Sequence, residues 1–146
     1  MEAFNFPRDP KKFALVLFAD EPGNSQPHDF LNEMKLPNAE RATVPEAKIT
    51  LYLLNPGHHA GGSKAAFFLR FGFTVALWQQ FAWALRRHAM DNEVALSEET
   101  KYGMRFVVDG PLVAPTGDVL NVRASWFINP GDDVPRFVTA HPLPKL

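Results

Sequence analysis

Two stretches of the sequence hold the residues best suited to chemistry: a glycine-rich loop near the middle and the last third of the chain. The loop, residues 55–64, reads Asn-Pro-Gly-His-His-Ala-Gly-Gly-Ser-Lys and leads into a predicted helix. Free amides at a helix N-terminus, the helix dipole and the ammonium of Lys64 together favour a bound phosphate. The loop is not a Walker A motif, which ends Gly-Lys-Ser/Thr rather than Gly-Ser-Lys. The alternative is a flexible loop in which Ser63 only caps the helix.

Four polar residues of the last third, Arg123, Arg136, Thr139 and His141, lie on two predicted strands. Alternation places Arg123 on the face of its strand that points away from the core, and Thr139 and His141 on the open face of the next strand. Arg136 starts that strand, and its long stem can reach outward. His141 alone is most simply a residue that ends a strand. Together with the histidines and the lysine of the loop, these groups could move protons and stabilise charge on a phosphate.

Four histidines could suggest a metal site, because neutral imidazoles are good zinc ligands: His58, His59, His88 and His141. Adjacent histidines such as His58 and His59 point apart in most backbones, and His88 lies near a helix end, where it would complement the dipole. The chain has no cysteine, which excludes thiolate ligands, thiol nucleophiles and disulfides. We therefore expect neither a metal nor another cofactor.

Length and composition indicate one folded domain at residues 34–146, preceded by an extension at 1–33. The extension carries three basic and six acidic residues, so the remainder of the chain is weakly basic and could accept an anionic partner. The longest apolar stretch, Phe13 to Ala19, covers seven residues, far too few for a membrane span. It lies within a predicted strand at 12–19. We expect a cytoplasmic protein that has no contact with a membrane.

Helical periodicity and punctuation predict three helices, at 44–54, 64–71 and 75–89. Thr43 and Glu46 match a capping box at the start of the first helix, whose core face would hold Val44, Ala47, Leu51 and Leu54. Gly72 would end the second helix in the left-handed conformation, and Thr74 would cap the third.

After Asn92 the period changes to two, which predicts strands at 93–97, 102–109, 118–128 and 135–141 joined by short turns. In the third strand Leu120, Val122, Ala124, Trp126 and Ile128 share an apolar face. Strict alternation in the fourth strand puts Phe137 on the open face with Thr139 and His141, and Val138 and Ala140 in the core. The expected fold class is α+β, with N-terminal helices packed on one face of a four-stranded antiparallel meander sheet.

Several separated blocks resemble the bacterial family called domain of unknown function 6883. The blocks, in chain order, are residues 34–40, 52–58, 62–65, 102–103, 107–112, 122–123, 126 and 135–142. The resemblance covers about residues 34–142, so the extension at 1–33 lies outside it. Helices followed by an antiparallel meander are also similar to the fold of barnase, colicin D and the RelE toxins, which are metal-independent ribonucleases.

These resemblances imply a toxin-type endoribonuclease that cleaves by attack of the ribose 2'-hydroxyl on the adjacent phosphate. RNA and a cognate antitoxin or immunity-type protein would be its partners. The alternative is a non-catalytic interaction module, an immunity or accessory protein, that binds a partner through the open sheet face. The residues expected to carry catalysis are His58, Lys64, Arg123, Arg136, Thr139 and His141. His141 or His58 would be the base or acid, the three cations would stabilise phosphate charge, and Thr139 would orient the phosphate.

Overall fold

The computed structural model describes residues 34–59 and 62–144, so the strand predicted at 12–19 lies outside the described residues. The described helical elements are η1 (Ala39–Arg41), α3 (Glu46–Lys48), the π-helical turn η2 (Ile49–Leu53), α4 (Gly62–Arg70) and α5 (Trp78–Asp91). They are followed by β1 (Val94–Thr100), β2 (Gly103–Val113), β3 (Val119–Ile128) and β4 (Arg136–Pro142). No helix in the described part of the chain is long and apolar enough to cross a membrane.

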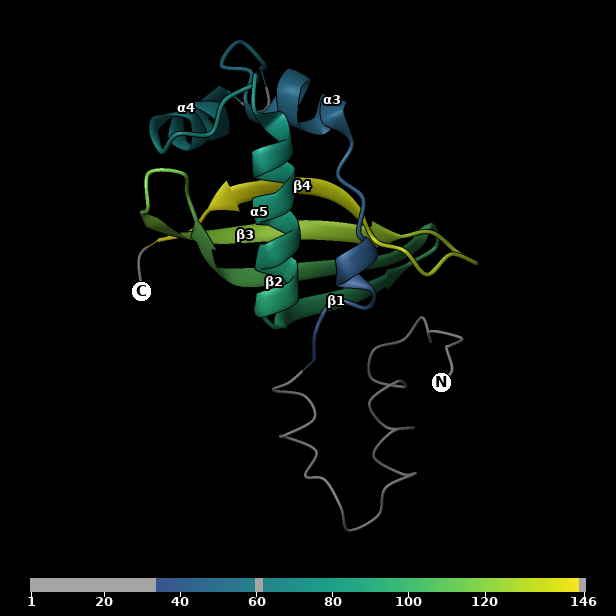
Figure 1. Cartoon of the computed structure of the whole chain (residues 1–146). Coiled ribbons are helices and arrows are strands. Elements are labelled where there is room, and N and C mark those ends of the chain that lie inside the picture. Colours follow the sequence, from purple (N-terminus) through teal and green to yellow (C-terminus); the bar gives the residue numbers. More distant parts are fainter. Residues whose placement is uncertain (1–33, 60–61, 145–146) are drawn as a thin grey trace.

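The four strands form one antiparallel sheet in the order β1-β2-β3-β4, so each strand pairs with its neighbour in sequence. Helix α5 crosses one face of this sheet, and α3 and α4 lie on the same side beyond β4 (Figure 1). This arrangement confirms the predicted α+β class and the meander. It leaves the opposite sheet face without a covering helix in the described residues.

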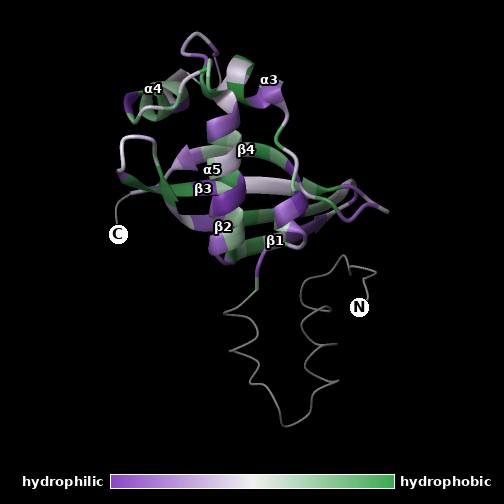
Figure 2. Ribbon diagram, in the orientation of Figure 1, coloured by the Kyte–Doolittle hydropathy of each residue, from purple (hydrophilic) through white to green (hydrophobic). Residues whose placement is uncertain are grey.

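The core lies between α5 and the covered sheet face. Phe81 and Leu85 of α5 are fully buried there, together with Phe106 of β2 and Trp126 of β3. Along the strands, hydrophobic and hydrophilic residues alternate, as the colouring in Figure 2 shows. Alternation of this kind gives each strand one apolar and one polar face. The apolar face predicted for the third strand is confirmed, since all five of its members are buried.

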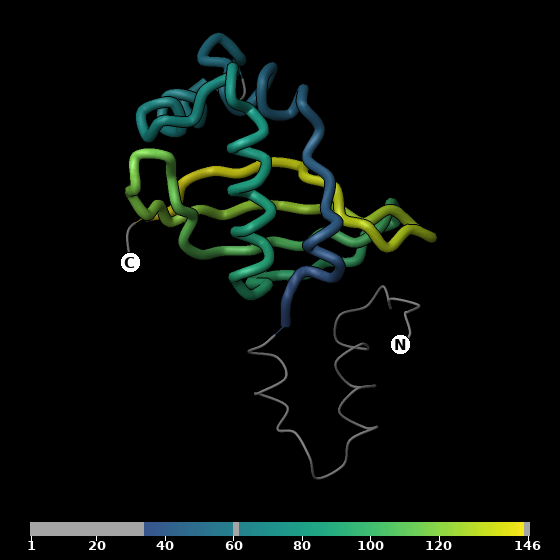
Figure 3. The backbone as a smooth tube through the Cα atoms, viewed as in Figure 1, coloured from purple at the N-terminus to yellow at the C-terminus, as the bar shows by residue number. Residues whose placement is uncertain are grey.

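Residues 34–44 cross the covered face of the sheet from β1 to β4, as the tube in Figure 3 shows. At one end the amide of Val94 donates to the carbonyl of Met34 at 2.9 Å. At the other, Thr43 donates to Pro135 and accepts from Phe137, both at 2.9 Å, in a parallel bridge beside β4. The predicted capping box is therefore wrong: the Thr43 side chain caps nothing, because the Thr43 backbone pairs with β4 and Pro45 precedes the helix.

The helix predicted at 44–54 is interrupted, and its buried face differs from the prediction. It consists of α3 followed by η2, and the wider π turn brings Ile49 and Leu53 into the core. Leu51, expected on the core face, is 64% exposed, and Ala47 is exposed as well. Gly72 follows α4 with a φ of 100°, as predicted for the end of that helix. The third helix begins at Trp78 and its N-cap residue is Leu77, so the prediction that Thr74 caps it is wrong. Thr74 accepts the Leu77 amide at 3.2 Å, one turn before α5 begins.

A bulge in β4 corrects the predicted faces of that strand. Ser125 pairs with Thr139 but Trp126 pairs with Phe137, so Val138 is an extra residue in the ladder. Phe137 consequently faces the core beside Trp126, at a ring distance of 5.4 Å, and is fully buried. Ala140 is in the core as predicted, whereas Val138 is only half-buried. Strict alternation failed here because the bulge inserts one residue.

Candidate active site

Three side chains from separate elements meet at β4, an edge strand of the sheet. The Lys64 ammonium of α4 donates to the Tyr52 hydroxyl of η2 at 2.7 Å. It also lies 3.4 Å from the Thr139 hydroxyl of β4, and the two hydroxyls are 3.1 Å apart. All three residues are half-buried, so the cluster is held in place and yet reachable from solvent. We call Tyr52, Lys64 and Thr139 the edge cluster.

The electrostatics of the edge cluster favour an anion. Among residues 34–59 and 62–144, no carboxylate forms an ion pair with Lys64. A second cation, the Lys48 ammonium, lies 5.7 Å from the centre of the Tyr52 ring. Burial by itself raises the pKa of Tyr52. The hydrogen bonds with Lys64 and Thr139 and the charges of Lys64 and Lys48 outweigh it, so the pKa of the phenol is lowered from its ordinary value.

The glycine-rich loop brings histidines to this cluster. The rings of Tyr52 and His58 pack edge to face, with ring centres 5.0 Å apart, and His59 stacks on His58 at 4.9 Å. Some amides in the described part of the loop, residues 55–59 and 62–64, are already hydrogen-bonded within it. The Gly57 amide donates to the Asn55 side chain and the Gly62 amide to the His58 carbonyl. Helix α4 begins at Gly62, so Ser63 lies inside it and is not its cap.

Arg123 and His141 are cross-strand partners on the open face, as predicted. Arg123 is bound to Asp109 of β2 through two bonds of 2.8 Å, and these bonds raise the pKa of the guanidinium. His141 places its Nδ1 3.1 Å from the Pro142 carbonyl. His141 is two residues from Thr139 along β4, a spacing of about 6.6 Å between their Cα atoms. The pair is therefore one step along the sheet from the edge cluster.

Arg136 lies toward the other end of β4. Its guanidinium packs over the Phe127 ring at 5.7 Å and donates to Asn129 at 3.4 Å. The structure thus gathers His58, Lys64 and Thr139 around one tyrosine, sets Arg123 and His141 beside them, and engages Arg136 elsewhere.

Tyr52 is the member of the edge cluster that the sequence analysis did not single out. Its neighbours in the chain, Leu51 and Leu53, made it look like one more apolar helix residue. One signal was present: a half-buried tyrosine needs a hydrogen-bond partner for its hydroxyl. The partners themselves, Lys64 and Thr139, could not be chosen from the sequence, because β4 is distant along the chain.

His88 has a different role from the one the sequence suggested. It lies in the last turn of α5, as expected, but it is only 2% exposed and its ring contacts the sheet. Its Nε2 lies 2.9 Å from the Val122 carbonyl and 3.2 Å from the Gly110 carbonyl, and burial lowers its pKa. The neighbouring Asn92 donates to the carbonyls of His88 and Pro111. A Cβ on Gly110 would overlap the Asn92 side chain, so glycine permits this close approach.

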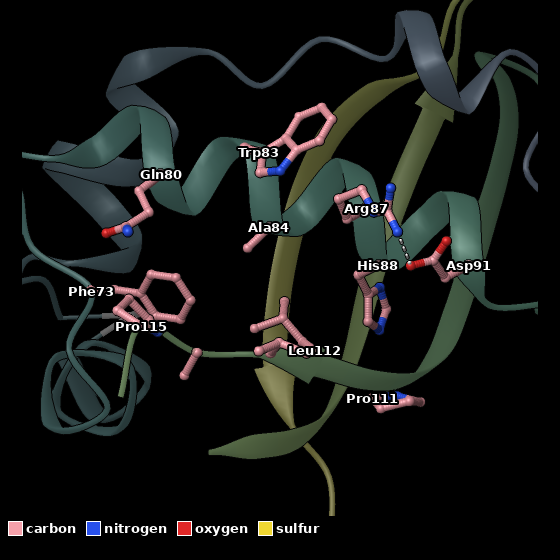
Figure 4. A pocket seen from close by; sticks show the side chains of 12 residues that line it. Phe73, Gln80, Trp83, Ala84, Arg87, His88, Asp91, Pro111, Leu112 and Pro115 are labelled. Carbon is pink, nitrogen blue, oxygen red and sulfur yellow. Dashed lines mark ion pairs between the residues drawn. The ribbon is translucent and has the colours of Figure 1, made fainter. Parts of the chain in front are cut away.

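A cavity of about 310 Å³ lies between α5 and the end of β2, and His88 is one of the residues that line it (Figure 4). Its buried floor includes Phe73 and Leu112, and Trp83 and the ion pair of Arg87 with Asp91 stand on the α5 side. None of the six residues predicted for catalysis lines it. Within the described residues no group of three or more histidine and acidic side chains could hold a metal ion.

Residues 35–144 match the family described as domain of unknown function (DUF6883), and the chain belongs to this family. A chain of the contact-dependent growth inhibition toxin–immunity protein complex from Klebsiella pneumoniae 342 has a similar fold, with a TM-score of 0.52 and 17% sequence identity. That match covers 70% of this chain and 100% of the other. No curated protein matches the sequence. The family predicted from the sequence blocks is confirmed, and the fold is like that of a chain from a toxin–immunity complex.

Proposed function

We propose that this member of the domain of unknown function 6883 family is a metal-independent endoribonuclease of the toxin type, cleaving RNA by attack of the 2'-hydroxyl on the adjacent phosphate. The observation that carries the proposal is the edge cluster. Lys64 is held by two hydroxyls at a sheet edge, and its charge is not balanced by a carboxylate of the described residues. A phosphodiester oxygen could accept a further, charge-assisted hydrogen bond from the Lys64 ammonium. The fold likeness to a chain of a toxin–immunity complex supports the same class.

The groups around the cluster supply the two things that this reaction needs. Lys64 stabilises the charge that grows on the phosphate oxygens, and Thr139 orients the phosphate by a hydrogen bond. His58 packs against Tyr52 and His141 lies two residues after Thr139 on β4, so the ring nitrogens of both can donate or accept a proton close to the cluster. Arg123 and Arg136 would contact phosphates further along the strand of RNA. Protein groups thus provide both the charge and the protons, and a metal ion has no step to perform.

The test is incubation of RNA with the purified full chain in the presence of a chelator. We expect fragments with 2',3'-cyclic phosphate ends, and a loss of activity of about 10²-fold or more in Lys64→Ala and a smaller loss in His141→Ala. Lys101→Ala is the matched control, because Lys101 also lies over a tyrosine, Tyr102, at 5.3 Å but stands exposed in the β1–β2 turn. Cleavage that persists in Lys64→Ala and disappears only with a metal chelator would contradict the proposal.

A second candidate function, a non-catalytic module that binds a partner protein through the open sheet face, is favoured by one observation. Two arginines of that face are already neutralised, Arg105 by Glu98 at 3.2 Å and Arg123 by Asp109 at 2.8 Å. A face with balanced charges and an exposed Leu96 suits a protein surface better than an RNA backbone. RNA left intact, together with tight binding of the full chain to the product of a neighbouring gene, would favour this module.

The two candidates also predict different partners. A toxin would act on cytoplasmic RNA and would be neutralised by a cognate antitoxin or immunity-type protein that covers the edge cluster. A module would bind its partner whether or not Lys64 is present. Binding of a candidate partner to wild type and Lys64→Ala, measured by calorimetry, separates these cases.

A further inference from the structure

We propose that the Tyr52 phenolate is the base that removes the proton from the attacking 2'-hydroxyl. This role rests on the proposed RNA cleavage and assigns its first proton transfer to a residue outside the set predicted from the sequence. Tyr52 is the titratable group in contact with both Lys64 and Thr139, so it stands where the phosphate would be held.

The contacts of Tyr52 favour its ionised form. An ammonium can only donate, so the 2.7 Å contact from Lys64 requires the phenol oxygen to accept. The Thr139 hydroxyl, at 3.1 Å, can donate to the same oxygen once the phenol has lost its proton. The Lys48 ammonium lies on the ring side at 5.7 Å. These three groups, from α3, α4 and β4, each stabilise a negative charge on the phenol. The imidazole of His58 also faces the Tyr52 ring, with ring centres 5.0 Å apart.

The proposed step balances as follows. The 2'-hydroxyl proton passes to Tyr52 Oη while the 2'-oxygen bonds to phosphorus, and the bond from phosphorus to the 5'-oxygen breaks. The departing 5'-oxygen takes a proton from water or from an imidazole such as His58. The products are a 2',3'-cyclic phosphate and a 5'-hydroxyl, and Tyr52 returns its proton to solvent. Lys64 takes no part in proton transfer. Because it lies near both the phenol and the phosphate, it can stabilise the negative charge on each of them.

The chain offers a clean way to observe this group, because it contains only two tyrosines, Tyr52 and Tyr102. In Tyr102→Phe, the phenolate absorbance reports Tyr52 alone. We expect it to titrate below the ordinary value of a tyrosine, and to move upward when Lys64→Met is added. Titration at the ordinary value, unchanged by Lys64→Met, would overturn the inference without any measurement of RNA.

Activity provides the second readout. We expect the cleavage rate of Tyr102→Phe to rise with pH until Tyr52 is ionised. In Tyr52→Phe the cleavage rate should fall by about 10²-fold or more. Replacing Tyr52 by 3-fluorotyrosine, whose phenol is more acidic, should move the rising limb to lower pH. A purely structural tyrosine would not move that limb.

The outcomes separate the two proposals. Wild type that leaves RNA intact overturns both the nuclease and the base. Wild type that cleaves, with Tyr52→Phe cleaving equally fast and with the same pH dependence, overturns only the role of Tyr52 and returns the base to a histidine. Far-ultraviolet circular dichroism of Tyr52→Phe confirms that a loss of rate is not a loss of folding.

Discussion

Tyr52 and His88 are both polar rings held by hydrogen bonds, and they lie in opposite settings. His88 is buried beneath α5, and its partners are the backbone carbonyls of Gly110 and Val122. Tyr52 is half-buried at a sheet edge, and its partners are the side chains of Lys64 and Thr139. The pKa of each is lowered, but burial is the cause at His88, whereas at Tyr52 burial opposes the shift and hydrogen bonds and cations produce it.

The difference shows how a structural residue can be told from a candidate catalytic one. Carbonyls are fixed acceptors that exchange no proton, so His88 serves to join α5 to β2 and β3. Ammonium and hydroxyl groups can stabilise or release a charge, and solvent can reach them beside Tyr52. Changes at His88 should therefore act on folding, and changes around Tyr52 should act on ionisation and turnover. Substitutions at these two rings and at their neighbours test this contrast.

The largest effect is expected from His88→Ala. It leaves a cavity under α5 and removes the donor shared by two carbonyls, which should lower the free energy of unfolding by about 3 kcal/mol. Urea denaturation measures this value. His59→Ala is the control. Because the His59 ring is exposed, its removal should lower the free energy of unfolding by less than about 0.5 kcal/mol. Equal losses in the two variants would show that His88 does not join the elements as described.

Acid should weaken the fold through the same residue. Because burial lowers the pKa of His88 from 6.5, the unfolded chain binds a proton below that pH while the folded protein does not. Stability from this group is fully present above pH 6.5 and is lost as pH falls, by at most about 1.4 kcal/mol per pH unit. Denaturation at several pH values should show this slope in wild type and a smaller slope in His88→Gln. An identical slope in both proteins would assign the acid sensitivity to other groups.

Tyr52→Phe should cost at most about 1 kcal/mol of folding free energy, because it keeps the ring packing and removes only the hydroxyl. The same variant is expected to have the large effect on turnover described above. Thermal unfolding and a cleavage assay on one preparation compare the two effects. A loss of stability as great as that of His88→Ala would make Tyr52 a structural residue, contrary to the contrast drawn here.

The smallest effect concerns Lys48. Its ammonium stands over the Tyr52 ring at 5.7 Å, whereas Lys64 is hydrogen-bonded to the phenol oxygen at 2.7 Å. Lys48→Met should therefore raise the pKa of Tyr52, and by less than Lys64→Met does. The absorbance titration of Tyr102→Phe with either lysine change measures both shifts. A larger shift from Lys48→Met would mean that long-range charge, and not the hydrogen bond, controls the phenol.

Much of the fold could be predicted because its signals are local. The change of period after Asn92 marks the start of the sheet, and the proline and glycine turns set the meander. Gly72 ends α4 as expected because a left-handed residue at that place favours glycine whatever packs around it. The apolar face of β3 followed from alternation alone.

The errors have a common cause, which is that tertiary pairing overrode a local pattern. Thr43 matched a capping box, but its backbone pairs with β4 instead. Strict alternation placed Phe137 on the open face, but the bulge at Val138 directs its side chain into the core. His88 was assigned to the helix dipole because the strand carbonyls that it contacts lie 22 and 34 residues further along the chain.

The candidate site divides in the same way. Residue type and period are properties of short segments, so they suffice to place Lys64, His58 and Thr139 on elements that can face one another. That these residues meet at Tyr52 follows from the tertiary packing, because the contacts of the edge cluster join residues 12, 75 and 87 positions apart. Contacts over such separations depend on how α4 and η2 pack against the edge of the sheet, and no local pattern encodes that packing.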